Sequence, residues 1–141
     1  MTMAYREQTA WLTLVAMLIA YTIYFGMVLT GQVGPRLFDI LLPFGVIAAI
    51  QAVAVITGHI FLAIRNGPDA RQADERDRAI ARRGSTAGYY ILIVGMIVVG
   101  VVMPFSDPAP KIVNTALLTI VLAETVRYVL VIASYRRGWH G

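Results

Sequence analysis

Cysteine is absent from the chain, and this absence excludes disulfide bonds, thiolate metal sites, cysteine nucleophiles and S-acylation. Charge is also scarce, since only 14% of the residues are Asp, Glu, Lys or Arg. A soluble globular domain carries about 25% charged residues and needs polar residues at helical or strand spacing to give each element a wet face. The sequence lacks this pattern, which argues against a soluble domain.

Catalytic sequence motifs are absent as well. No P-loop, G-x-G-x-x-G, G-x-S-x-G or H-E-x-x-H pattern occurs. The side chains that an intramembrane hydrolase could use are Ser85, Ser134 and His59, and they follow no recognisable nucleophile–base or metal-ligand spacing. We therefore expect a protein that is not an enzyme and that has no catalytic residues, no cofactor and no metal site.

Long apolar runs dominate the sequence instead. Hydrophobic residues make up 58% of the chain, and its mean hydropathy is +0.70. A hydrocarbon core about 30 Å thick needs about 20 apolar residues per helical span. Four segments meet that length, namely 11–29, 40–64, 86–103 and 112–133. The sequence thus predicts an all-α, polytopic membrane four-helix bundle in which residues 1–141 form a single transmembrane domain.

Basic residues are distributed unequally between the two sides of this predicted bundle. One side receives nine arginines, six of them within residues 65–84, whereas the other side receives only Arg36 and Lys111. Because cytoplasmic loops are enriched in Lys and Arg, we expect both termini and the central loop to lie in the cytoplasm. The first apolar run is longer than the apolar h-region of a secretory signal peptide and no cleavage pattern follows it, so we expect a retained helix.

The segment 65–84, RNGPDARQADERDRAIARRG, is the one long polar stretch. Asp69 and Gln72 have the spacing of an N-cap and its capping-box partner. The pattern predicts a cytosolic helix over residues 70–83 that projects from the bundle or lies loosely against it, and that bends at Gly84 into the third span. Four acids accompany the six arginines and no aromatic stacking platform is present, so we expect no nucleic-acid binding.

The charge of this segment is more patterned than a topology signal requires, which favours contact with a cytosolic or membrane protein. The predicted contact residues are Asp74, Glu75, Arg76, Asp77 and Arg78.

The stretch DERDRAIARRG, residues 74–84, directly precedes a span that begins with Gly88-Tyr89-Tyr90. These residues resemble the charged loop of small, uncharacterised four-helix bacterial inner-membrane proteins, and the four-span layout is similar as well. The resemblance implies a location in the bacterial cytoplasmic (inner) membrane and no known reaction. It also implies, from related proteins, a suspected linkage to a small DNA-binding regulator.

Small residues mark the third predicted span. Gly84 and Gly88 have G-x-x-x-G spacing, and Gly95 continues the same seam. Small residues at such positions let helix backbones approach closely in a membrane. The seam predicts helix packing, either within one chain, which we favour, or between the subunits of a homo-oligomer.

Five polar residues are expected at similar depth inside the membrane. Glu124 and Arg127 lie on one face of the fourth span, and Tyr128 can reach the same carboxylate. Gln51 and His59 are their expected partners on the second span. Charged groups at that depth cost about 2.5–3.5 kcal/mol each, so they should be paired. The cluster is either a structural clamp or a site for an ion, proton or small polar ligand.

Two hypotheses for function follow from these patterns. The first is a non-enzymatic anchor, sensor or interaction protein that acts through the charged loop, with the lipid bilayer and a protein as its partners. The second is a small oligomeric transporter or channel that uses the intramembrane polar cluster as its path. Glu124 already has a neutralising arginine nearby, which weakens the second hypothesis.

Overall fold

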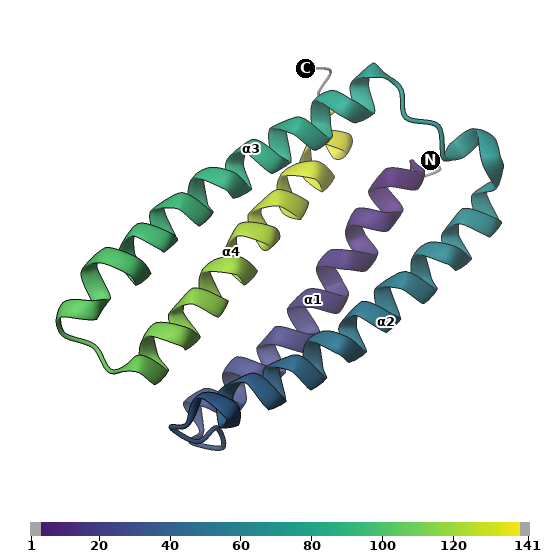
Figure 1. Cartoon of the computed structure of the whole chain (residues 1–141). Helices are drawn as coiled ribbons and strands as arrows, with labels where there is room; N and C mark the ends of the chain where they lie inside the picture. The colour runs from purple at the N-terminus through teal and green to yellow at the C-terminus, as the bar shows by residue number, and fades with distance from the viewer. Residues whose placement is uncertain (1–3, 139–141) are drawn as a thin grey trace.

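The chain folds into long helices joined by short connections across residues 4–138, the residues that the computed structural model describes (Figure 1). The long helices are α1 (Tyr5–Leu29), α2 (Leu37–Ala70), α3 (Glu75–Ile97) and α4 (Ala109–Arg136). A π-helical turn, η1 (Val98–Val102), and a 3-10 turn, η2 (Met103–Phe105), prolong α3. The predicted all-α class is confirmed, and the described part of the chain contains no strand.

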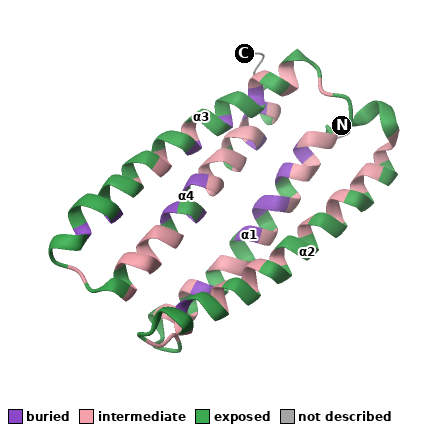
Figure 2. Cartoon of the chain, in the orientation of Figure 1, coloured by how far each residue is buried: buried purple, intermediate pink, exposed green. Residues whose placement is uncertain are grey.

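All four helices are long and apolar enough to cross a membrane. Each contains a stretch with a mean hydropathy of 2.0 to 2.3, within candidate spans of 25 to 34 residues. Much of this apolar surface faces outward (Figure 2). Ile50, for example, is 65% exposed and Ile64 is 78% exposed. Because water would penalise such a surface, this architecture is that of a multi-pass membrane protein.

The helices follow one another across the bundle in the order α3, α4, α1, α2 (Figure 1). Each hairpin, α1 with α2 and α3 with α4, packs internally, and the contact between α1 and α4 joins the two. The termini of the described chain lie at the same end of the molecule as the connection between α2 and α3 (Figure 1). We call this the charged end. Arg36 and Lys111 lie at the opposite end.

The core lies along the α1–α4 contact. Ala10, Leu14 and Met17 on α1 are 3–5% exposed and pack with Ile132 on α4. Their spacing of four and three residues keeps one stripe of α1 turned toward α4. Tyr24 continues the stripe toward the opposite end, where its hydroxyl donates to Asn114 Oδ1 on α4.

The α3–α4 contact is close because glycine lines it. A Cβ atom added to Gly84 would lie 2.8 Å from the backbone oxygen of Arg127, and one added to Gly88 would lie 3.1 Å from that of Ala123. At Gly95 the clash would be with the side chain of Thr119. The predicted glycine seam therefore packs against α4 of the same chain. Helix α3 runs through Gly84 without a break, so the predicted bend at this residue is wrong.

The charged segment differs from the expected separate helix. Helix α2 extends beyond the predicted span until Gly67 (φ 81°, ψ 171°) interrupts it, and one more turn ends at Ala70. Helix α3 begins at Glu75, with Asp74 as its N-cap. The predicted cap at Asp69 is therefore wrong. Asp74 caps α3 because Asp77 completes a reciprocal capping box. Each carboxylate accepts a hydrogen bond from the other residue's backbone N–H, at 2.7 and 3.1 Å.

Candidate functional site

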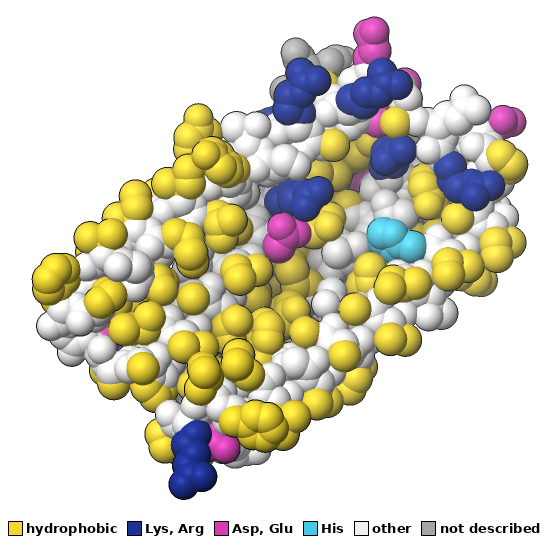
Figure 3. Space-filling model, viewed as in Figure 1, with side chains coloured by type: hydrophobic (Ala, Val, Ile, Leu, Met, Phe, Trp, Pro, Cys, Tyr) yellow, Lys and Arg dark blue, Asp and Glu magenta, His cyan; other side chains and the backbone are white. Residues whose placement is uncertain are grey.

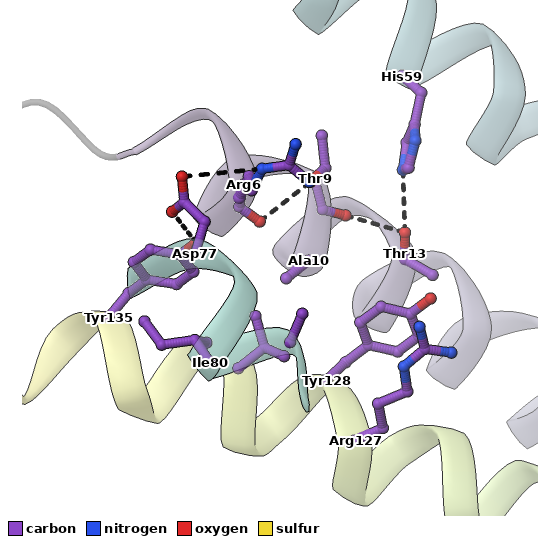
Figure 4. Close-up of a pocket in the computed structure, with 12 residues that line it drawn as sticks. Arg6, Thr9, Ala10, Thr13, His59, Asp77, Ile80, Arg127, Tyr128 and Tyr135 are labelled. Atoms are coloured by element: carbon purple, nitrogen blue, oxygen red, sulfur yellow. Dashed lines mark hydrogen bonds and ion pairs between the residues drawn. The ribbon is translucent and has the colours of Figure 1, made fainter. Parts of the chain in front are cut away.

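A crevice lies near the charged end, where all four helices contribute side chains (Figure 4). Its volume is about 130 Å³. Its polar lining consists of Arg6, Thr9, Thr13, His59, Asp77, Arg127, Tyr128 and Tyr135. Polar side chains from distant parts of the sequence meet here, which makes this crevice the candidate site.

One end of the crevice is built around Asp77 of α3. The hydroxyl of Tyr135 on α4 donates a hydrogen bond to Asp77 Oδ1, and Arg6 Nε on α1 lies 3.9 Å from Asp77 Oδ2 (Figure 4). Ile80, one turn further along α3, is fully buried beneath this group. The start of α3 is therefore fixed to both α1 and α4, rather than lying loosely beside them.

The other end of the crevice holds His59 of α2. The Thr13 hydroxyl has a single hydrogen, which it donates to the Thr9 carbonyl at 2.9 Å. It must then accept a hydrogen bond from His59 Nε2, which lies 3.1 Å away (Figure 4). This assignment places a ring hydrogen on Nε2. His59 is thus a hydrogen-bonded residue between α2 and α1.

Arg127 and Tyr128 of α4 line the crevice at the same end as Thr13 and His59 (Figure 4). The Arg127 guanidinium lies 5.3 Å from the centre of the Tyr128 ring, a distance at which a cation is attracted to the ring face. Its Nη1 lies 3.5 Å from Glu124 Oε2. The predicted pairing of Glu124 with Arg127 is therefore present. Both side chains remain about 40% exposed, at 39% for Glu124 and 40% for Arg127.

Arg127 also lines a second cavity of about 250 Å³ between α3 and α4. The remaining lining residues are Ser85, Gly88, Tyr89, Leu92, Ile120, Ala123 and Glu124. Gly88 lines this hollow from α3, at a point where the backbones of α3 and α4 lie close together. Figure 3 shows charged side chains within the mainly hydrophobic middle of this face.

Gln51 takes no part in either cavity. Its position on α2 is eight residues, about 12 Å, further from the charged end than that of His59. The sequence placed Gln51 and Glu124 opposite each other by depth alone. Helix α1 lies between α2 and α4, however (Figure 1). The structure thus joins His59, Arg127 and Tyr128 in one crevice and leaves Gln51 apart.

The five predicted contact residues of the charged segment divide into two groups. Asp77 faces the crevice, and the Arg76 guanidinium lies 5.4 Å from the centre of the Tyr135 ring, with Nη2 3.5 Å from the Tyr135 carbonyl oxygen. Asp74, Glu75 and Arg78 are exposed. The backbone N–H of Asp77 donates to the Asp74 carboxylate and lowers the pKa of that carboxyl.

Several residues of this end were missed by the sequence analysis. Glu7 is buried and pairs with Arg136 at 3.0 Å, across 129 positions of sequence. Arg83 donates to the hydroxyl of Ser134, which is 1% exposed. Glu7 carried one usable signal, because it is the only acid before Asp39. The other contacts depend on which helices are neighbours, and composition does not report this.

Within residues 4–138, no group of three or more His, Asp or Glu side chains comes together as a metal site. Comparison with protein families, with curated proteins and with solved structures finds no match to this chain.

Proposed function

We propose that this protein is a non-enzymatic interaction protein of the bacterial cytoplasmic membrane, which presents the charged hairpin, residues 65–84, to a protein partner in the cytoplasm. The distribution of basic residues supports this orientation, because nine arginines belong to the charged end and only Arg36 and Lys111 to the other. The resemblance of residues 74–84 to the loop of small bacterial inner-membrane proteins supports the location.

The charged residues of the hairpin fall into two groups, those that attach it to the bundle and those that are exposed, and this division supports the proposal. Arg76 and Asp77 hold it against α1 and α4. A second set is exposed, and it comprises Asp69, Arg71, Glu75, Arg78 and Arg82. An element whose backbone is held in place and that displays charges of both signs is suited to recognising a complementary surface, because little backbone entropy remains to be lost on binding.

The N-terminus of α1 adds to this rigidity. Arg6 Nη2 donates to the backbone oxygen of Arg71 at 3.1 Å, and Gln8 and Asn66 exchange side-chain amide hydrogen bonds, the shorter at 3.1 Å. Both sides of the hairpin are therefore attached to α1. An unrestrained topology signal would need none of these contacts.

A crosslinking experiment tests this function while leaving the anchoring contacts intact. A photoreactive residue is placed at Ala81, which is exposed, and adducts formed in living cells are identified. We expect one protein to dominate the adducts, and to be lost when Glu75, Arg78 and Arg82 are changed to Gln. Arg36→Gln with Lys111→Gln, at the opposite end, is the matched control. Identical adducts in all three proteins would contradict the proposal.

A transporter or channel is the second candidate, because Arg127 lines both the crevice and the α3–α4 cavity. In that case Glu124, Arg127 and His59 would form part of a polar path, and Gln51 would not. Proteoliposome flux that falls in Glu124→Gln would support this candidate. Absence of flux, or flux that Glu124→Gln leaves unchanged, would contradict it.

A further inference from the structure

The pair Glu124–Arg127 is incompletely satisfied within one chain. A single contact at 3.5 Å joins the two side chains, and each is about 40% exposed at the surface of α4. Arginine has five N–H donors in a planar fork, and among residues 4–138 only the contact to Glu124 engages them by hydrogen bonding. The exposed parts of both groups therefore need partners from outside the chain.

The depth of the pair along α4 strengthens the requirement for hydrogen-bonding partners. Arg127 lies nine residues before Arg136, the end of α4, and Glu124 lies twelve residues before it. With a rise of 1.5 Å per residue, these positions are about 14 Å and about 18 Å below the charged end. A headgroup layer is only about 5–8 Å thick. With Arg136 placed at the outer edge of the headgroups, the backbone of the pair lies at the depth of the hydrocarbon, where acyl chains offer no hydrogen-bonding groups.

The surface next to the pair is shaped to receive another helix. The α3–α4 cavity opens beside Glu124 and Arg127, with Gly88 among its lining residues. Tyr89 on α3, 58% exposed, and Ile120 on α4, 47% exposed, also line it. A hollow bordered by exposed apolar side chains lets another membrane helix pack closely by van der Waals contact.

Symmetry indicates what this partner is. Copies of one chain insert into a membrane with the same orientation, so a closed pair has its two-fold axis along the membrane normal and each copy contributes the same patch. In such a pair, Glu124 of one copy lies about 4.5 Å, three helical residues, from the level of the other copy's Arg127. An arginine side chain spans this offset. A patch that contains one acid and one arginine at this spacing is therefore complementary to itself.

We propose that the chain forms a parallel two-fold dimer through the face of α3 and α4 that carries Tyr89, Ile120, Glu124 and Arg127. Each Arg127 then bonds its own Glu124 and the partner's Glu124, which gives a closed ring of four alternating charges. The ring satisfies in hydrocarbon the groups that one chain leaves exposed. This dimer does not depend on the proposed role of the charged hairpin, although it would place two hairpins on one membrane side.

Cysteine crosslinking tests the dimer without disturbing the charges, because the chain has no cysteine of its own. Ile120→Cys lies on the proposed face, and Leu122→Cys lies on another, exposed side of α4. We expect oxidation in native membranes to link Ile120→Cys into dimers and to leave Leu122→Cys monomeric. Equal crosslinking at both positions, or none at Ile120→Cys, would overturn the proposal.

Charge reversal tests the reciprocal pairing. Glu124→Arg and Arg127→Glu chains, with different tags, are expressed alone and together, and their co-purification is measured. We expect each alone to associate about tenfold more weakly than the wild type, because two interhelical polar contacts are lost. The mixture should recover the association. Asp107 and Lys111 form an ion pair at 2.8 Å at the opposite end of the molecule. Reversal of these two charges is the control and should leave the association unchanged.

Lipid is the competing occupant of this face, and the same preparations distinguish it. Native mass spectrometry is the measurement. A dimer that is weakened when Glu124 or Arg127 is changed would support the proposal. A wild-type monomer that retains an anionic phospholipid, lost in Arg127→Gln, would show that a lipid headgroup covers the pair and that the dimer is wrong. If a reversed chain fails to insert, the cysteine variants still decide the question.

Discussion

The hydroxyl of Tyr135, near the end of α4, donates a hydrogen bond to the carboxylate of Asp77, in the first turn of α3. Two residues separated by 58 positions in sequence thereby join the charged hairpin to the last helix. Asp77 also lies within ion-pair distance of Arg6 on α1. This one carboxylate therefore ties three helices together.

Tyr135→Phe should loosen the hairpin without removing the ring on which Arg76 packs. A hydrogen bond to a charged group contributes about 1.5–3 kcal/mol, and the Arg6 contact remains, so we expect a loss of about 1–2 kcal/mol in local stability. Hydrogen exchange of the backbone amides in the first turns of α3 measures this loss. Tyr90→Phe, on an exposed part of α3, is the control. Unchanged exchange in Tyr135→Phe would show that the bond does not hold the hairpin.

The helices could be predicted from the sequence, whereas most contacts of the charged end could not. Hydropathy and length predicted four spanning helices, and the glycine spacing predicted a packing seam, because both properties are local to one helix. The depth argument brought His59 and Arg127 to the same crevice, but it misplaced Gln51. Depth gives the position of a residue along the membrane normal, whereas the order of the helices across the bundle gives its position in the membrane plane.

The cap of α3 illustrates a second limit. Asp69 and Asp74 both offer a carboxylate followed three residues later by a capping-box partner. Only Asp74 begins a helix that buries an apolar residue, Ile80, against the bundle. The two N-cap patterns are locally similar, and tertiary packing determines which of them begins a helix. The contacts of Arg6 and Glu7 were beyond reach for the same reason, since their partners lie 71 and 129 residues away.

Gly88→Ala should separate α3 from α4. The new Cβ would lie 3.1 Å from the Ala123 backbone oxygen, and backbone cannot give way as a side chain can. Overpacking of this kind costs about 1–3 kcal/mol, and Gly84→Ala, at 2.8 Å from the Arg127 oxygen, should cost at least as much. Thermal stability in detergent is the measurement. Gly45→Ala, which meets nothing within 4 Å, is the control, and equal stability of the three variants would contradict the seam.

The Asp74 cap should weaken in acid. Since the N–H of Asp77 lowers the pKa of the folded carboxyl, its stabilising effect is complete above the unfolded pKa of about 3.9 and is lost as the pH falls through the lower, folded pKa. Amide exchange at the start of α3, corrected for intrinsic rates, should therefore accelerate only below about pH 4. Asp74→Asn keeps an acceptor oxygen and should remove the acid dependence. A dependence that persists in this variant would assign it to another group.

The ion pair between Glu7 and Arg136 should respond unequally to the loss of its two members. The Glu7 side chain is 9% exposed, whereas that of Arg136 is 58% exposed. Arg136→Gln leaves a carboxylate buried without its charged partner, which costs about 1–3 kcal/mol. Glu7→Gln leaves an arginine that water can solvate, so its effect should be under about 1 kcal/mol.

The double variant Glu7→Gln, Arg136→Gln completes this test. Because it leaves no buried charge, it should be more stable than Arg136→Gln alone, and the difference measures the coupling between the two side chains. Chemical unfolding in mild detergent reports the three free energies. Arg136 also lies 5.7 Å from the centre of the Trp11 ring, so Arg136→Lys, which keeps the charge, separates the ionic contact from packing on the ring. Equal losses in Glu7→Gln and Arg136→Gln would mean that burial of Glu7 is not what makes this contact matter.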